Sequence, residues 1–240
     1  MFGLTDGKIP PGKRVCAVIP VYNNASTVRS VAQNVLRHIP DLLVMDDGST
    51  DADLSSLLHD LPLYCCRREH RGKGAALRHA LKILADSDCE YMLTLDADGQ
   101  HDPADIPAFL RLAEPGGNLF GIGCRNFSGQ PVPAGSRFGR RLSNDLLRLE
   151  CGLRSEDTQS GFRLYPVKLL AGQSFRCGHF DFETEVLFLA AEAGAEFHDL
   201  PVKVYYPPER ERVTHFRPLP ELTRLTLLHL RLLGKRFFSA

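Results

Sequence analysis

The chain has 240 residues, of which 43% are hydrophobic and 24% charged, and this composition is ordinary for a globular protein. Lys and Arg together number 29, as do Asp and Glu, so the whole molecule has no electrostatic bias toward nucleic acid. No run of about 18 apolar residues occurs, so no membrane-spanning helix is predicted, and residues 1–13 lack the apolar core of a signal peptide.

Strand and helix signals alternate through the first half of the chain. An unbroken apolar run predicts a buried strand over 14–20. Val28, Val31 and Val35 then repeat at helical spacing, after Ser26 as the expected helix cap. By the same reasoning, further strands are expected over 42–45, 63–66 and 91–95, and further helices over 54–58, over 73–85 and from 103 onward.

The second half is less regular. A strand over 120–124 leads into a loop rich in Gly and Pro over 126–139 and a helix to about residue 152. A strand after Arg163, a helix over 182–193 with Gly194 as its C-cap, and a last strand over 202–206 follow.

This alternation predicts an α/β fold with a doubly wound, mostly parallel, Rossmann-like sheet. We expect a single domain over 14–206, followed by a charged loop and an amphipathic C-terminal helix over 207–240. Ligands of such sheets bind beyond the carboxyl ends of the strands. The segments 20–24, 46–51 and 96–101 all follow strands, so they should converge at that edge.

The seven cysteines are scattered, with no C-x-x-C pair and no zinc-type spacing. We interpret them as small buried apolar residues in a reducing compartment. The expected location is therefore the cytoplasm, with attachment to the inner face of the membrane as a further option.

The strongest chemical signal is Asp96-Ala97-Asp98 at the end of an apolar strand. Two acids separated by one residue point to the same side of an extended chain, and the small Ala97 lets a ligand approach closely. Mg²⁺ and Mn²⁺ favour carboxylate oxygens and complete their shell with water and phosphate. The motif predicts a site for Mg²⁺ or Mn²⁺ with a diphosphate; alone it would also fit a solvated acidic turn.

A second acidic cluster, Asp46-Asp47-Gly48-Ser49-Thr50-Asp51, also follows a strand. Its carboxylates could accept hydrogen bonds from a base or a ribose, while Ser49 or Thr50 could cap the next helix. Paired with the first cluster across one sheet edge, it predicts a nucleotide pocket.

Four motifs in this order resemble family 2 inverting glycosyltransferases of GT-A fold, in the branch of the dolichyl-phosphate mannosyltransferases. They are Val18-Ile19-Pro20-Val21-Tyr22-Asn23-Asn24, Asp46–Asp51, Arg71-Gly72-Lys73-Gly74 and Asp96–His101. The resemblance covers roughly residues 14 to 205. The family often has Glu where this chain has Asn24.

The resemblance implies a role for each matching residue. The nucleotide would be bound by Pro20, Tyr22, Asn24, Asp46 and Asp47, and Lys73 would have a structural or diphosphate-neutralising role. Asp96 and Asp98 would hold the metal and diphosphate, with Gln100 as a third metal ligand. Arg125, together with Arg137 or Arg140, would face phosphate groups, and Arg163 would lie near the acceptor.

The implied reaction is metal-dependent and inverting, with transfer of a sugar from a UDP- or GDP-sugar to a polyprenyl phosphate-like or other membrane-proximal acceptor. A bound cation with Arg and Lys would stabilise the charge of the leaving diphosphate. A hydroxyl acceptor needs a general base, for which Asp157 is the best candidate; a phosphate acceptor needs none. Asp157 could also be an ordinary turn residue.

Each of three further segments has two possible interpretations. Asp181 is expected to cap the helix after it, with Glu183 and Glu185 in the first turn, or these acids contact the acceptor. Arg212 and His215 could close on the donor or belong to a solvated linker. Residues 221–240 form a basic amphipathic helix that could lie on a membrane or pack on the protein.

Three rival functions share parts of this pattern. A haloacid dehalogenase-type phosphatase also uses Asp-x-Asp-Gly, but after its first strand. A sugar-nucleotide pyrophosphorylase should have a Gly-rich basic loop after the first strand, where this chain has Asn23-Asn24-Ala25-Ser26. A non-catalytic nucleotide-sugar-binding module would not require both Asp96 and Asp98.

Overall fold

The computed structural model describes residues 15–127, 132, 134–206 and 218–238. Its strands are β1 (Val15–Val21), β2 (Leu42–Asp46), β3 (Tyr64–Arg67), β4 (Tyr91–Thr94), β5 (Leu119–Arg125), β6 (Arg163–Pro166) and β7 (Glu196–Val202). They form one sheet in the order β3-β2-β1-β4-β6-β5-β7. Only β6 runs against its neighbours, so the predicted mostly parallel α/β sheet is confirmed.

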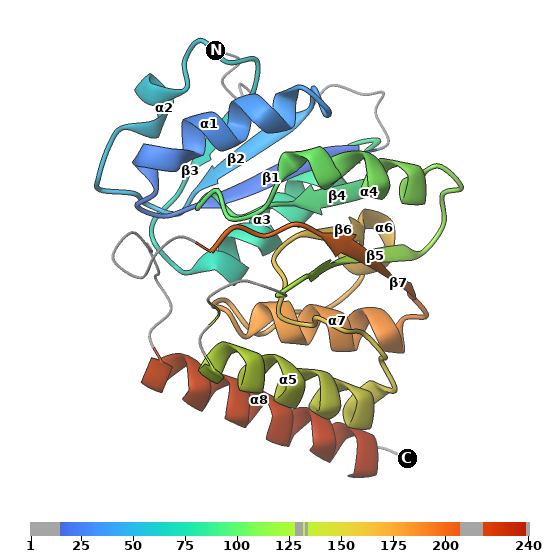
Figure 1. The fold of residues 1–240 in the computed structure, drawn as a ribbon. Helices are drawn as coiled ribbons and strands as arrows, with labels where there is room; N and C mark the ends of the chain where they lie inside the picture. The colour runs from blue at the N-terminus through green and yellow to red at the C-terminus, as the bar shows by residue number, and fades with distance from the viewer. Residues whose placement is uncertain (1–14, 128–131, 133, 207–217, 239–240) are drawn as a thin grey trace.

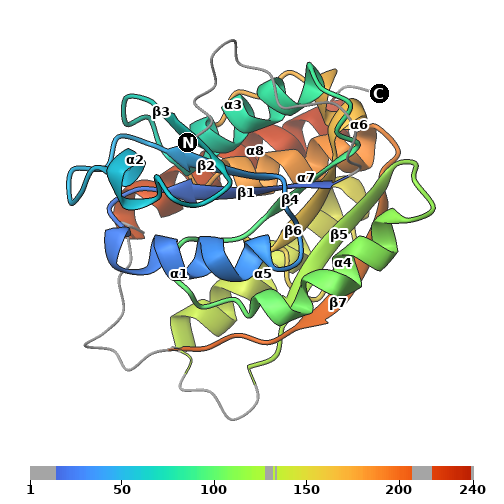
Figure 2. The same cartoon turned by 90° about the horizontal axis from the view of Figure 1, so that it is seen from above.

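Helices cover both faces of this sheet (Figure 1 and Figure 2). One face carries α1 (Ala25–Leu36), α2 (Leu54–Leu57), the short 3₁₀ turn η1 (Pro103–Asp105) and α4 (Ile106–Ala113). The other carries α3 (Lys73–Ala85), α6 (Val167–Ala171) and α7 (Phe182–Glu192). Beyond α7 lie α5 (Ala134–Cys151) and α8 (Pro218–Phe238), side by side in a further layer.

The central strands explain why the core has two halves. Successive side chains of β1 point to opposite faces of the sheet. Val18 belongs to the apolar cluster under α3 and α7, whereas Ala17 and Ile19 belong to the cluster under α1 and α4. Because both faces are covered, β1 and β2 read as unbroken apolar runs.

The reversed strand β6 gives the site its geometry. It pairs with β4 on one side and β5 on the other, both antiparallel. The amino end of β6 therefore lies at the carboxyl ends of β4 and β5, and the segment 157–162 that precedes it runs along that edge. Asp96 comes shortly after β4, and Arg125 is the last residue of β5. The two residues flank this segment.

Two predicted elements differ from the structure. The last strand is β7, Glu196–Val202, rather than 202–206; only Val204 makes an isolated bridge, with His101. β7 lies at the edge of the sheet, where Pro201 and charged side chains are tolerated and the apolar signal is weak. Helix α1 begins at Ala25, one residue before the expected cap Ser26, and Asp51 accepts the Ala25 N–H at 2.9 Å.

Helix α8 belongs to the core through one of its faces. Leu228 and Leu232 are buried among the residues of the α3–α7 side, and His229 contacts Glu150 of α5 at 2.7 Å. None of the helices in the described part of the chain is both long and apolar enough to cross a membrane.

Candidate active site

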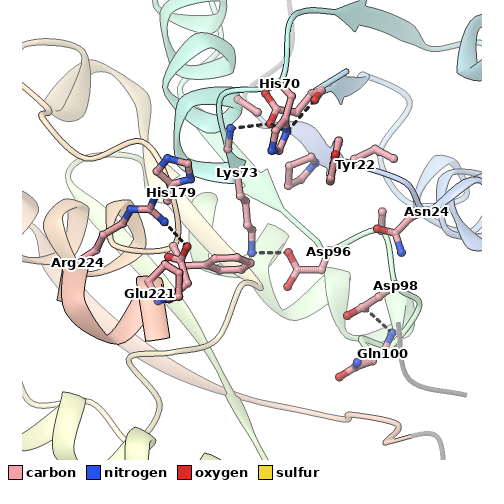
Figure 3. Close-up of a pocket in the computed structure, with 18 residues that line it drawn as sticks. Tyr22, Asn24, His70, Lys73, Asp96, Asp98, Gln100, His179, Glu221 and Arg224 are labelled. Atoms are coloured by element: carbon pink, nitrogen blue, oxygen red, sulfur yellow. Dashed lines mark hydrogen bonds and ion pairs between the residues drawn. The ribbon is translucent and has the colours of Figure 1, made fainter. Parts of the chain in front are cut away.

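A cavity of about 660 Å³ opens at the carboxyl edge of the sheet, within the size range of small-molecule sites (Figure 3). All the residues predicted to bind the nucleotide or the metal line it except Asp46. Its lining comprises Pro20, Val21, Tyr22, Asn24, Asp47, His70, Gly72, Lys73, Ala76, Asp96, Ala97, Asp98, Gln100, His179, Phe180, Pro220, Glu221 and Arg224.

Lys73 bridges two acids at the base of this cavity. Its Nζ lies 2.6 Å from Asp96 Oδ1 and 3.0 Å from Glu183 Oε1. Figure 3 shows the lysine extending from the start of α3 to Asp96. Burial alone would lower the pKa of Lys73, but the charges of Asp96 and Glu183 raise it above the ordinary value. Lys73 is therefore a permanent cation beside the first acid of the motif.

Asp98 has no such partner among the described residues. Its Oδ1 accepts the backbone N–H of Gln100 at 3.0 Å. Burial, and next the negative charge of Asp96, raise the pKa of Asp98 to about 6. Burial would likewise raise the pKa of Asp96, but the Lys73 ammonium outweighs it and holds that pKa below the ordinary value.

These two acids fit a divalent cation that brings its own oxygen ligands. The described residues contain no cluster of three His, Cys, Asp or Glu that could hold a metal alone. Mg²⁺ in phosphate-handling sites is commonly bound through one or two carboxylates plus substrate phosphates. Asp98, raised in pKa and without a cationic partner in the described structure, together with Asp96 and the Gln100 amide, supplies such a partial set.

Gly161 fixes the position of Asp96. A Cβ atom at residue 161 would lie 2.4 Å from Asp96 Oδ2, so only glycine leaves room for the carboxylate. The Thr94 hydroxyl donates to the Gly161 carbonyl at 2.8 Å and ties β4 to the same segment. The Ser160-Gly161 stretch thus supports the acidic motif directly.

The opposite side of the cavity offers an aromatic surface. The rings of Tyr22 and His70 stack with centroids 3.9 Å apart and an interplanar angle of 20°. His70 Nδ1 lies 2.8 Å from Asp47 Oδ2, which also accepts the Gly72 N–H at 2.7 Å. Asp47 therefore shapes the loop that carries His70 and borders the cavity.

Asp46 lies outside the cavity, unlike the other residues expected to bind the nucleotide. Its side chain is 1% exposed and does not line the cavity. One carboxylate oxygen accepts the Ser49 N–H at 2.7 Å and the other contacts Arg67 Nη1 at 3.0 Å. Asp46 therefore shapes the loop after β2 and joins it to the end of β3.

The glycines around Lys73 allow close packing. Gly72 has a φ of +100°, and a Cβ at Gly74 would lie 2.4 Å from Phe182 Cβ. The Ala75 N–H donates to the Gly178 carbonyl at 2.8 Å. The start of α3 is thereby held against the segment before α7, which brings Lys73 and Glu183 together.

A second pocket, here called the arginine pocket, lies beside the end of β5. It has a volume of about 860 Å³. It is lined by Cys124, Arg125, Asn126, Phe127, Arg137, Arg140, Arg141, Glu156, Asp199 and Pro201. The Arg140 guanidinium lies 4.1 Å from the Phe127 ring centroid. Four guanidinium groups face Glu156 and Asp199, with Asp157 buried behind Arg125, so the pocket keeps a net positive charge and favours an anion.

Asp157 holds Arg125 in this pocket. Arg125 Nε and Nη2 donate to its two carboxylate oxygens at 2.7 and 2.8 Å, and the Arg125 backbone N–H donates at 3.1 Å. Burial would lower the pKa of Arg125, but these bonds to Asp157 raise it. Asp157 is 0% exposed, so its geometry fits the positioning of Arg125 rather than proton removal from an acceptor.

Arg163 is also placed differently from the expectation. It is 0% exposed, and its guanidinium donates to the backbone carbonyls of Thr158, Ser160 and Glu183 at 2.6–2.7 Å. The side chain thus braces the 158–161 segment against α7. It lines neither pocket.

The acidic residues before and within α7 form hydrogen bonds and ion pairs with other groups of the protein. Asp181 precedes the helix as predicted, but its carboxylate accepts the His179 N–H at 3.0 Å rather than a helix N–H. Glu185 accepts the N–H groups of Arg176 and Cys177 and pairs with Arg231 of α8. Arg212 and His215 lie outside the described residues.

Two groups of residues that contribute to the cavity were not predicted from the sequence. Glu183 reaches the Lys73–Asp96 pair, and the first two turns of α8 bring Pro220, Glu221 and Arg224 to the cavity. In Figure 3 Glu221 and Arg224 lie across the cavity from Tyr22 and Asn24. Glu221 is 5% exposed, an unusual state for an acid in a surface helix, and the sequence carries no signal for it.

The chain is similar in sequence to several known proteins. The family model described as Glycosyl transferase family 2 matches residues 16–171. The glycosyltransferase AglJ of Haloferax volcanii is 26% identical over 213 residues, covering 88% of this chain and 69% of AglJ. A UDP-N-acetylglucosamine–dolichyl-phosphate N-acetylglucosaminyltransferase of Methanococcus voltae is 24% identical over 221 residues, covering 81% and 86% of the two chains.

Among solved structures, glucosyl-3-phosphoglycerate synthase from Mycobacterium tuberculosis, in complex with Mn²⁺, UDP and its product, superposes with a TM-score of 0.66. The match covers 94% of this chain and 80% of that one at 22% sequence identity. The likeness confirms the predicted GT-A fold.

Proposed function

Because the chain belongs to glycosyl transferase family 2, we propose that it moves a sugar from a nucleotide-diphosphate donor to the phosphate of a polyprenyl-type lipid. The main support is the meeting of two unlike pockets at one sheet edge. One contains Asp96, Asp98 and an aromatic surface; the other contains arginines. The segment from Asp157 to Gly161 connects them, since Asp157 holds Arg125 and Gly161 borders Asp96.

In this proposal the cavity binds the donor. The stacked Tyr22 and His70 rings provide a flat surface for the base, with Asn24 and Pro20 beside them. The diphosphate lies toward Asp96, Asp98 and Lys73. Asp96, Asp98 and Gln100 would hold Mg²⁺ or Mn²⁺, which would supply positive charge that favours departure of the diphosphate. The proposed donor is a UDP- or GDP-sugar.

The acceptor phosphate binds the arginine pocket. Arg125, fixed by Asp157, presents its remaining N–H groups there, and Arg137 and Arg140 add charge. An oxygen of the acceptor phosphate attacks the anomeric carbon from the face opposite the leaving group. The bond to the diphosphate breaks with both electrons on its oxygen, so the configuration inverts and no proton has to be removed.

The engagement of Asp157 favours a phosphate over a hydroxyl acceptor. Both its oxygens are used by Arg125, whereas a hydroxyl acceptor would need a free base. The Methanococcus voltae relative is named for transfer to dolichyl phosphate, which is the same acceptor chemistry. All seven cysteines are free, in keeping with a reducing compartment, so we propose action at the cytoplasmic face of a membrane.

The test of donor binding is a thermal-shift panel of UDP, GDP, dTDP and CDP with and without Mn²⁺. A ligand present at 100 times its Kd stabilises the folded state by about 2.7 kcal/mol. We expect one nucleotide to raise the melting temperature only when Mn²⁺ is present. A panel without any Mn²⁺-dependent shift would refute the donor site.

The acceptor is tested with the matching nucleotide sugar and a short-chain polyprenyl phosphate. Product should form with the phosphate but not with the corresponding polyprenol, and Arg125→Gln should abolish the transfer while leaving the nucleotide shift unchanged. Equal transfer to the free alcohol would contradict the phosphate acceptor.

A further inference from the structure

Exposed apolar side chains gather on two neighbouring helices. Nine large apolar side chains are exposed among the described residues, and eight of them belong to α5 and α8. These are Phe138, Leu142, Leu149, Leu219, Leu222, Leu227, Leu230 and Phe237. The two helices lie side by side in the outermost layer (Figure 1 and Figure 2). Such a concentration marks an interaction site in a soluble protein.

These exposed side chains do not belong to the helix face that packs against the core. The inner face of α8 is already packed against the protein, since Leu228 and Leu232 are each 3% exposed. Leu227 and Leu230 of the same helix are each 62% exposed. Helix α8 therefore has one apolar side for the protein and another for a different environment.

The exposed charges of the same helices are almost all positive. Along the described parts of α5 and α8, the exposed charged residues are Arg137, Arg141, Arg148, Arg231, Lys235 and Arg236, against the single acid Asp145. Arg231 and Lys235 are ion-paired with Glu185 and Glu192 of α7, so the excess positive charge comes from the other four. Apolar residues set among cations are typical of helices that lie in a membrane interface. A second copy of this chain would instead bring like charges together, which opposes self-association.

We propose that the exposed sides of α5 and α8, called the α5–α8 surface, dock on a bilayer that contains anionic phospholipid. The apolar side chains enter the interface, and the basic ones contact lipid phosphates. Docking itself does not require the proposed sugar transfer; only its use, bringing the pockets to a lipid acceptor, rests on that function.

The α5–α8 surface is connected to both pockets. The first two turns of α8 contribute Glu221 and Arg224 to the donor cavity, and α5 contributes Arg137 and Arg140 to the arginine pocket. A protein docked through these helices has both pockets beside the bilayer. A phosphate on a membrane lipid could then reach them without leaving the interface.

The experiment is flotation of the full-length chain with vesicles of phosphatidylcholine alone or mixed with phosphatidylglycerol. We expect binding to the mixed vesicles and weaker binding to phosphatidylcholine. The double variant Leu227→Glu, Leu230→Glu should weaken binding tenfold or more, because it removes two apolar side chains from the interface. Arg148→Gln should weaken binding about fivefold, and only with phosphatidylglycerol present.

The matched control is Ser30→Glu, Gln33→Glu, which adds the same charge on exposed positions of α1, on the other side of the sheet. It should bind as the parent does, and all variants should keep the parent melting temperature. Absence of vesicle binding by the parent, or equal binding by the double leucine variant, overturns the proposal. So does a dimer in sedimentation that the leucine variant abolishes, since a second copy would then cover the surface.

The nucleotide shift separates this proposal from the proposed function. The leucine variant should keep the Mn²⁺-dependent shift, because neither residue lines the cavity. Docking without any nucleotide shift in the parent would leave the α5–α8 surface standing and refute the donor site alone.

Discussion

At the residue scale, Asp96 and Asp98 differ although they belong to one motif. Asp96 has the Lys73 ammonium at 2.6 Å, and its negative charge is balanced within the protein. Asp98 lacks an ion pair in the described structure, and its pKa rises to about 6. The negative charge of Asp98 at neutral pH is therefore less favourable in the fold than in water, and nothing in the described structure balances it as Lys73 balances Asp96.

Asp98→Asn should raise the stability of the ligand-free protein but abolish its stabilisation by Mn²⁺ and nucleotide. The folded pKa of about 6 lies above the ordinary 3.8, so wild-type stability falls as pH rises through this interval. Without ligands, Asp98→Asn should melt higher than wild type at neutral pH, and the gain should vanish near pH 4. With Mn²⁺ and the nucleotide, only the wild type should be stabilised.

Differential scanning fluorimetry across this pH range measures both effects. The control is Asp88→Asn, which removes an exposed carboxylate beyond the end of α3 and should follow the wild type throughout. A variant that melts like wild type at neutral pH would show that Asp98 carries no unfavourable charge in the fold.

Sequence reasoning identified the acidic motif but not the direction taken by the Arg163 side chain. Asp96 and Asp98 follow a buried strand, so their position at the sheet edge could be inferred. Arg163 stands two residues after Gly161, equally close to the site in sequence, yet it turns inward to three carbonyls. Which way a side chain leaves an irregular segment depends on long-range packing, and local pattern does not encode it.

At the element scale, the 157–161 segment before β6 carries the site. It lies between the ends of β4 and β5 only because β6 is reversed. An apolar strand pattern does not reveal its direction, which explains why sequence reasoning could not join Asp157 to Arg125. The strands buried on both faces, such as β1, were found with nearly correct bounds, whereas the edge strand β7 was misplaced.

Gly161→Ala tests this support without altering a proposed ligand. The new methyl group would lie 2.4 Å from Asp96 Oδ2 and must displace the carboxylate. We expect the Mn²⁺-dependent nucleotide affinity to fall by roughly tenfold or more, in line with about 1–3 kcal/mol for overpacking.

Calorimetric titration of nucleotide with Mn²⁺ measures this loss. Gly172→Ala, where a Cβ meets no atom within 4 Å, serves as the control and should bind normally. Unchanged affinity in the Gly161 variant would mean that the position of Asp96 is not critical for the donor.

At the scale of the whole molecule, α8 is both part of the core and the outermost layer. We expect a chain that ends before Pro218 to lose about 4 kcal/mol or more of unfolding free energy, since Leu228 and Leu232 are buried leucines worth about 2 kcal/mol or more each. Urea denaturation measures the loss. Equal midpoints for the truncated and full chains would contradict the packing of α8.

The amphipathic character of this helix was predicted, but its division into two apolar sides was not. The sequence pattern of 221–240 left membrane and protein contact as alternatives. The structure assigns Leu228 and Leu232 to the protein and leaves Leu227 and Leu230 exposed. Neighbouring leucines thus have different surroundings, a distinction that depends on where α5 and α7 lie.

Under the proposed docking, the outer strands of the sheet have a consequence for molecules that would be crowded together on a bilayer. Confinement to two dimensions multiplies encounters between copies, and an open strand edge would invite them to join into a continuous sheet. The β7 rim presents Glu196, Asp199 and Pro201, and the opposite rim, β3, is only four residues long. Neither rim is a good template for another strand, so the protein can reach high surface density without aggregating through its sheet.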